Sequence, residues 1–103
     1  MNIKWSDFAI NDLNDIYEFY AEKNLQVAAK LYNSIIDETE ILKTYPYIAS
    51  VEHIFEDFTE TIRSLVICKG KFKVIYQVEN NMIYVFHLWD CRQEPEKLRS
   101  YFK

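Results

Sequence analysis

The sequence contains little that would loosen a chain, with one glycine and two prolines among 103 residues. This scarcity leaves little room for long loops or flexible linkers. Half of the residues are hydrophobic and 17% are aromatic, a composition that argues against disorder. The length suffices for one hydrophobic core and is too short for two. We therefore expect residues 1–103 to form a single domain.

The sequence also lacks a long apolar run, and we expect no leader at its start. No stretch approaches the length that spans a bilayer, and the start MNIKWSDF has no charged segment followed by an apolar one. We therefore expect a cytoplasmic protein with no membrane partner. Its two cysteines, Cys68 and Cys91, fit a reducing compartment. With two His and two Cys far apart, no zinc-type spacing exists, so we expect neither a metal nor another cofactor.

Positive charge is scarce overall and unevenly placed. Residues 61–103 hold eight Lys and Arg against four acids, a net +4, whereas residues 1–60 hold four against twelve, a net −8. The sum is the net −4 of the chain. This division predicts a basic sheet beside acidic helices, and the basic side is where a function is to be sought.

The first half predicts an edge strand and two helices. The strand spans Asn2–Trp5, and Ser6 can cap the helix that follows. The first helix has an apolar face with steps of three and four residues, and the second is expected over residues 25–44, ended by Pro46. Because the break between them is short, they should form an antiparallel hairpin. Residues 47–60 are ambiguous and fit a loop with a short strand, and His53 is given no role.

Residues 61–92 predict a three-strand antiparallel meander. Three apolar runs are separated only by Lys69-Gly70 and by residues 79–81, breaks short enough for hairpin turns. In the second run Phe72, Val74, Tyr76 and Val78 suit a face packed on the helices. Lys71, Lys73 and Gln77 then lie on the opposite face, and we expect Arg63 on that side too. The third run, Met82–Asp90, is apolar on both faces, so we expect it to be central or covered on both sides. A short helix over residues 95–102 completes an α+β fold.

This order of elements, over nearly the whole chain, resembles the RelE/ParE superfamily of toxin–antitoxin toxins, or plasmid stabilisation proteins. In the helices the resemblance is carried by Ala9, Asp12, Leu13, Ile16, Tyr20, Ala28, Leu31, Ile35, Leu42 and Pro46. In the meander it is carried by IRSL at 62–65, KFKVIYQV at 71–78, IYVF at 83–86 and DCRQEP at 90–95. The resemblance implies a toxin that an antitoxin holds inactive. It also implies a target, either mRNA cut on the ribosome or DNA gyrase, and the fold alone does not decide between them.

The resemblance to RelE-like nucleases also implies site residues. Metal-free RNA cleavage needs cations for the phosphate and groups that transfer protons. Arg63, Lys73 and Arg92 match basic positions on the family's strands and are the catalytic candidates, with Lys71 as a neighbour. The remaining candidates for binding are Gln77, His87, Trp89 and Tyr101. Many relatives carry a histidine where this chain has Trp89, so His87 is the residue that would stand in for it, and Tyr101 would act as the family's late aromatic.

Two features favour ParE-like inhibition over nuclease activity. Trp89 cannot transfer a proton near neutral pH, and a chain with a pI near 5.1 is poorly suited to the ribosome. A nuclease and an interaction-only member remain open alternatives. We expect an antitoxin as partner, bound along the sheet edge and the helix hairpin, or a second copy of the chain as a homodimer. Aromatic residues beyond the needs of the core motivate this expectation: Tyr32, Tyr47, Phe55 and Phe58.

Overall fold

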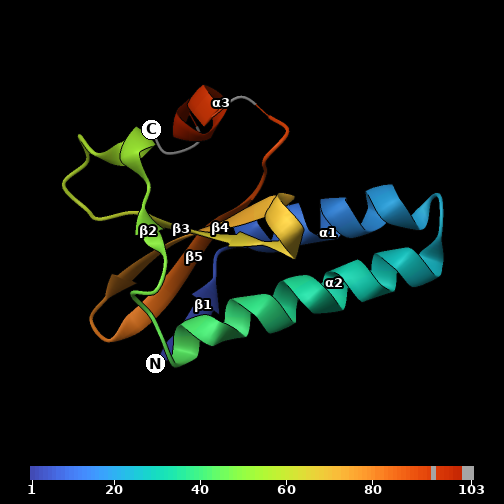
Figure 1. Cartoon of the computed structure of the whole chain (residues 1–103), viewed down its shortest axis with the longest axis horizontal. Helices are drawn as coiled ribbons and strands as arrows, with labels where there is room; N and C mark the ends of the chain where they lie inside the picture. The colour runs from blue at the N-terminus through green and yellow to red at the C-terminus, as the bar shows by residue number, and fades with distance from the viewer. Residues whose placement is uncertain (94, 101–103) are drawn as a thin grey trace.

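The structure is a computed structural model that describes residues 1–93 and 95–100. Figure 1 shows its elements in order. The helices are α1 (Asp7–Ala21), α2 (Leu25–Thr39) and α3 (Pro95–Ser100), with 3-10 turns η1 (Glu40–Lys43), η2 (His53–Phe55) and η3 (Cys68–Gly70). The strands are β1 (Asn2–Trp5), β2 (Ser50–Val51), β3 (Arg63–Ile67), β4 (Phe72–Glu79) and β5 (Met82–Asp90). No helix in the described part of the chain is long and apolar enough to cross a membrane.

Within the described residues, the strands form one sheet in the order β1-β5-β4-β3-β2. β3, β4 and β5 are antiparallel neighbours, so the predicted meander is confirmed. β1 pairs in parallel with β5 at one edge, and the short β2 pairs with β3 at the other. The predicted edge strand, helix hairpin and α+β class are therefore confirmed. β2 resolves part of the segment 47–60 that the sequence left ambiguous.

The two main helices begin where side chains cap them. The hydroxyl of Ser6 accepts a hydrogen bond from the N–H of Ala9 at 3.0 Å, as the sequence predicts. Asn24 caps α2 by accepting from the N–H groups of Gln26 and Val27. Ser6 also donates from its hydroxyl to the carbonyl of Phe86 on β5 at 2.7 Å. The same residue thus starts α1 and fixes it to the sheet.

The larger core lies between the sheet and the α1–α2 hairpin. It joins apolar side chains from both helices and from β3, β4 and β5. Its buried members are Ala9, Leu13, Ile35, Leu42, Ala49, Ile67, Phe72, Val74, Tyr76, Ile83, Val85 and Leu88. The prediction that Phe72, Val74, Tyr76 and Val78 face the helices is confirmed, since Val78 also packs against this cluster.

A second core lies on the other face of the sheet. It contains Phe55, Ile62, Ile75, Trp89 and Leu98. In Figure 1, α3 lies beside the green segment that holds η2, away from the α1–α2 hairpin. The prediction that Phe55 is surplus to the core is wrong, because it is 2% exposed. Tyr47, which is 60% exposed, fits that prediction.

Candidate functional site

Arg63 lies on the helix-covered face of the sheet, so its predicted place beside Lys73 is wrong. Residues directly opposite each other on antiparallel strands share a face, and Arg63 pairs with Tyr76, which is in the larger core. The guanidinium of Arg63 donates to the carbonyl of Ala49 at 2.8 Å and lies 5.3 Å from the ring centroid of Tyr47. Arg63 therefore holds the loop before β2 against the sheet.

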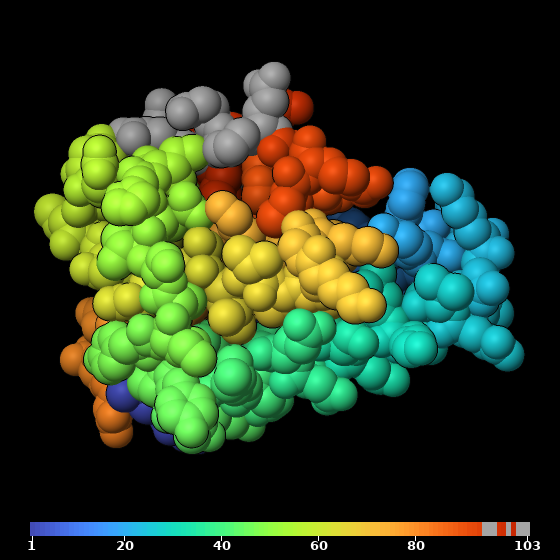
Figure 2. All heavy atoms as spheres, viewed as in Figure 1, coloured from blue at the N-terminus to red at the C-terminus, as the bar shows by residue number. Residues whose placement is uncertain are grey.

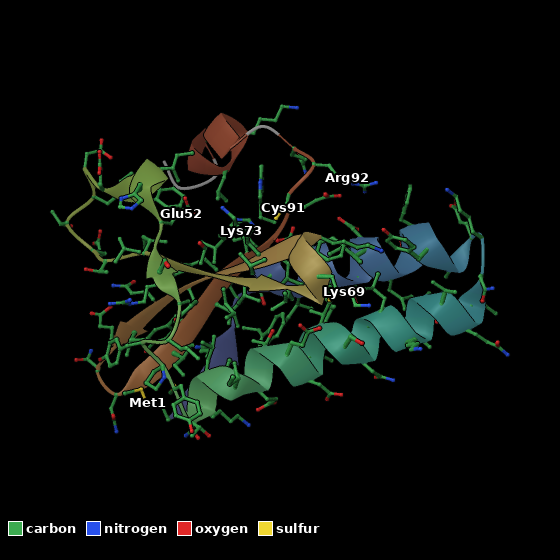
Figure 3. All side chains as sticks on the ribbon, in the orientation of Figure 1. Met1, Glu52, Lys69, Lys73, Cys91 and Arg92 are labelled. Atoms are coloured by element: carbon green, nitrogen blue, oxygen red, sulfur yellow. The ribbon has the colours of Figure 1, made fainter. Side chains whose placement is uncertain are left out.

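Lys73 lies on the opposite face, as predicted, and its charge is paired. Its Nζ atom is 3.0 Å from Oε2 of Glu52, and the same oxygen accepts from the hydroxyl of Ser64 at 2.8 Å. Burial of Glu52 works to raise its pKa, but hydrogen bonds from Lys73 and Ser64 outweigh burial, and the pKa is lowered. Figure 3 shows Glu52 and Lys73 side by side. This half-buried pair connects the segment before η2 to the middle of the sheet.

Arg92 is exposed just after β5 and is also paired. Its Nη2 atom is 2.7 Å from Oδ2 of Asp90, and its Nε atom and backbone N–H also donate to that carboxylate. The side-chain hydrogen bond from Arg92 is the main reason that the pKa of Asp90 is lowered. The side chain is therefore oriented by its own neighbour in sequence.

Trp89, at the position of the expected histidine, and His87, which would stand in for it on β5, are both buried against other side chains. Trp89 is 5% exposed and belongs to the second core. His87 is 8% exposed, with Nδ1 2.9 Å from Oδ2 of Asp12 and its ring 5.4 Å from the ring of Phe8. Asp12 also accepts from the N–H of Leu88, which β1 is too short to pair. Asp12 thus completes the outer edge of β5 with a side chain from α1.

The other candidates lie apart. Gln77 is half-buried and pairs with Tyr84 near the far end of β4. Lys71 is exposed in the turn before β4 and lines a groove with residues of α2, so its predicted place on the sheet face away from the helices is wrong. Tyr101 lies outside the described residues. Within residues 1–93 and 95–100, no three His, Cys, Asp or Glu side chains are grouped in a way that could hold a metal ion.

Comparison with known proteins gives the family. Residues 3–95 match the family described as the ParE toxin of the type II toxin–antitoxin system parDE. The chain belongs to the ParE toxin family. Its fold is similar to a chain of the chromosomal ParDE toxin–antitoxin system from P. aeruginosa, with a TM-score of 0.74 and 20% identity. The similarity covers 87% of this chain and 95% of that one. Among curated proteins, none matches the sequence.

In this ParE-family chain the candidate cations Arg63 and Lys73 lie on opposite faces of the sheet. Arg63 faces the helices, whereas Lys73 lies on the second face, close to Cys91, whose pKa its charge acts to lower against the larger effect of burial. The cations that sequence reasoning selected are held by partners that it missed. Asp90 could have been found from its spacing two residues before Arg92. Glu52 could not, because nothing in the ambiguous segment 47–60 connects it to a strand 21 residues later.

Proposed function

We propose that this ParE-family chain is the toxin of a type II toxin–antitoxin module and inhibits growth by binding a protein of the DNA gyrase class. We further propose that a cognate antitoxin neutralises it. The observation that carries the choice of mechanism is the pairing of the candidate cations. Glu52 holds Lys73, Asp90 holds Arg92, and Arg63 lies on the opposite face from Lys73.

This arrangement suits protein binding better than RNA cleavage. A nuclease site needs cations free to meet a phosphate and a proton donor close by. Here the cations already have anionic or carbonyl partners, and the position of the expected histidine holds the buried Trp89. The acidic chain would also be repelled by the ribosome's RNA at long range.

Two assays on the purified protein test the proposal side by side. We expect inhibition of supercoiling by DNA gyrase and no cleavage of mRNA on translating ribosomes. Arg92→Ala provides the internal check, since loss of a phosphate-binding cation should lower cleavage on the order of 100-fold in a nuclease. Ribosome-dependent cleavage that Arg92→Ala abolishes would overturn the proposal. No effect in either assay would favour a member kept only for interaction.

A further inference from the structure

A groove separates α2 from the turn that joins β3 to β4. It has a volume of about 440 Å³ and a mostly apolar wall, formed by Val27 and Leu31 of α2 together with Cys68. In Figure 2 the residues of the turn, in yellow to orange, lie over the surface of α2, in green to teal. None of the residues predicted as catalytic lines this groove.

Three lysines surround the apolar wall. Lys30 comes from α2, and Lys69 and Lys71 come from the turn, and all three are exposed. No ion pair found in residues 1–93 and 95–100 involves any of them. Lys73 and Arg92, by contrast, are both paired. The groove therefore carries three lysines without an ion-pair partner in the described part of the chain, against the single carboxylate of Glu38, in a chain whose net charge is −4.

The one carboxylate in the groove already has partners. Oε1 of Glu38 accepts from the backbone N–H of Cys68 at 3.1 Å, and Oε2 lies 3.5 Å from its Sγ. Burial, followed by the nearby charge of Glu38, raises the pKa of Cys68 to about 11, so this thiol stays neutral. Glu38 thus fixes the turn to α2 and does not form an ion pair with the lysines.

The turn holds Lys69 in a costly backbone conformation, whereas Lys71 has an ordinary right-handed one. Cys68, Lys69 and Gly70 have φ values of 53°, 56° and 87°, three consecutive residues in the left-handed region. Each non-glycine residue there costs on the order of 1 kcal/mol. The turn is closed by the N–H of Lys71 donating to the carbonyl of Cys68, and the N–H of Cys91 donates to the carbonyl of Lys71. These hydrogen bonds fix the backbone of the turn, which places Lys69 and Lys71 beside the groove.

We propose that this groove binds an acidic, amphipathic segment of the antitoxin. One apolar side chain of that segment packs against Val27 and Leu31, and its carboxylates meet Lys30, Lys69 and Lys71. An apolar wall beside three lysines that the described residues leave unpaired, and which outnumber the one carboxylate, favours this chemistry over a purely apolar or a basic segment. The proposal rests on the proposed function for the existence of an antitoxin, and it adds where a segment binds and which charges that segment carries.

Charge reversal of two lysines tests the proposal. The probe is the product of the small reading frame that adjoins the gene, and its affinity for the toxin is measured by titration calorimetry. Lys30→Glu with Lys71→Glu leaves the left-handed Lys69 in place and should weaken binding by at least about tenfold. The matched control, Lys43→Glu with Lys97→Glu, changes the net charge equally at exposed lysines of η1 and α3 and should stay within about twofold. Circular dichroism checks that both variants fold.

Two further measurements separate charge from packing. Affinity for the wild type should fall steeply from about 50 mM to about 500 mM salt, and less steeply for the groove variant. Val27→Ser should weaken binding by about threefold or more, whereas Ile48→Ser, an equivalent change at an exposed residue of the loop before β2, should not.

The outcomes distinguish this proposal from the proposed function. Tight binding of the wild type together with full affinity of the groove variant would overturn only the groove assignment. No binding of the wild type would overturn neutralisation by that antitoxin, and the groove assignment with it. If the groove variant instead changed the oligomeric state of the free toxin, the occupant would be a second copy of the chain and the proposal would be wrong.

Discussion

The two faces of the sheet are covered by different kinds of structure. On one face, the long helices α1 and α2 supply regular apolar stripes that meet β4 and β5 in the larger core. On the other, η2 and α3 cover a smaller cluster of Phe55, Ile62, Ile75, Trp89 and Leu98. The second face also carries the ion pair of Glu52 with Lys73. Helices of several turns bury more area than short turns do, so stability should depend mainly on the first face.

The largest expected effect comes from Tyr76 on the first face. This side chain is fully buried, and its hydroxyl donates to the carbonyl of Pro46 at 2.8 Å. Tyr76→Ala should lower the free energy of unfolding by about 3–5 kcal/mol, measured by urea denaturation. Tyr76→Phe should lower it by only about 1 kcal/mol, because the ring stays packed. Similar losses for the two variants would show that the hydrogen bond, and not packing, determines the stability of this face.

Phe55 tests the second face in the same way. It is 2% exposed and its ring packs edge-on against Phe58 at 5.1 Å between centroids. Phe55→Ala should cost about 2–3 kcal/mol, at the low end for an aromatic residue, because η2 can shift to fill the space. Hydrogen exchange should then speed up in residues 53–62 before it does in β4. A loss as large as that of Tyr76→Ala, spread over all amides, would mean that both faces unfold as one unit.

The same contrast explains what the sequence could and could not predict. The stripes of α1 and α2 and the alternation of Phe72, Val74 and Tyr76 have regular periods, so the first face followed from the pattern. Arg63 was misplaced because the register of β3 against β4 depends on their pairing, and a shift of one residue changes the face. Trp89 is buried by the segment that holds η2. This segment has no regular hydrophobic period, so nothing local in the sequence predicts that it packs on the sheet.

Glu52 gives the third prediction, which concerns pH. Its pKa is lowered in the folded state, so it contributes stability above its ordinary value of 4.5, and this contribution is lost as the pH falls through the folded-state pKa. Glu52→Gln should therefore lower the free energy of unfolding by about 1–2 kcal/mol at pH 7. The difference in this free energy between the variant and the wild type should become smaller below about pH 4.5. Urea midpoints measured across this range give the comparison.

The control for this prediction is Glu56→Gln. Glu56 has a side chain 75% exposed and lies 3.8 Å from His53 in the same segment, so the change should have little effect at any pH. If the loss of unfolding free energy in Glu52→Gln were the same at every pH, the shape of the side chain would matter and its charge would not. The ion pair of Glu52 with Lys73 would then not be what holds the η2 segment to the second face.

The smallest expected effect comes from the β4–β5 turn, which joins two strands that contribute side chains to both faces of the sheet. Asn80 and Asn81 have φ values of 50° and 63°, so both central residues of this two-residue turn are left-handed, as a type I′ turn requires. Asn followed by Gly is the preferred pair there, because glycine adopts this conformation without strain. Asn81→Gly should therefore raise the free energy of unfolding by about 0.5 kcal/mol, and Asn81→Ala should lower it by about 1 kcal/mol. Thermal and urea unfolding of both variants measure the difference. Because the turn joins β4 to β5, which contribute side chains to both faces, hydrogen exchange should change by the same factor on the two faces. A change confined to one face would show that they unfold separately.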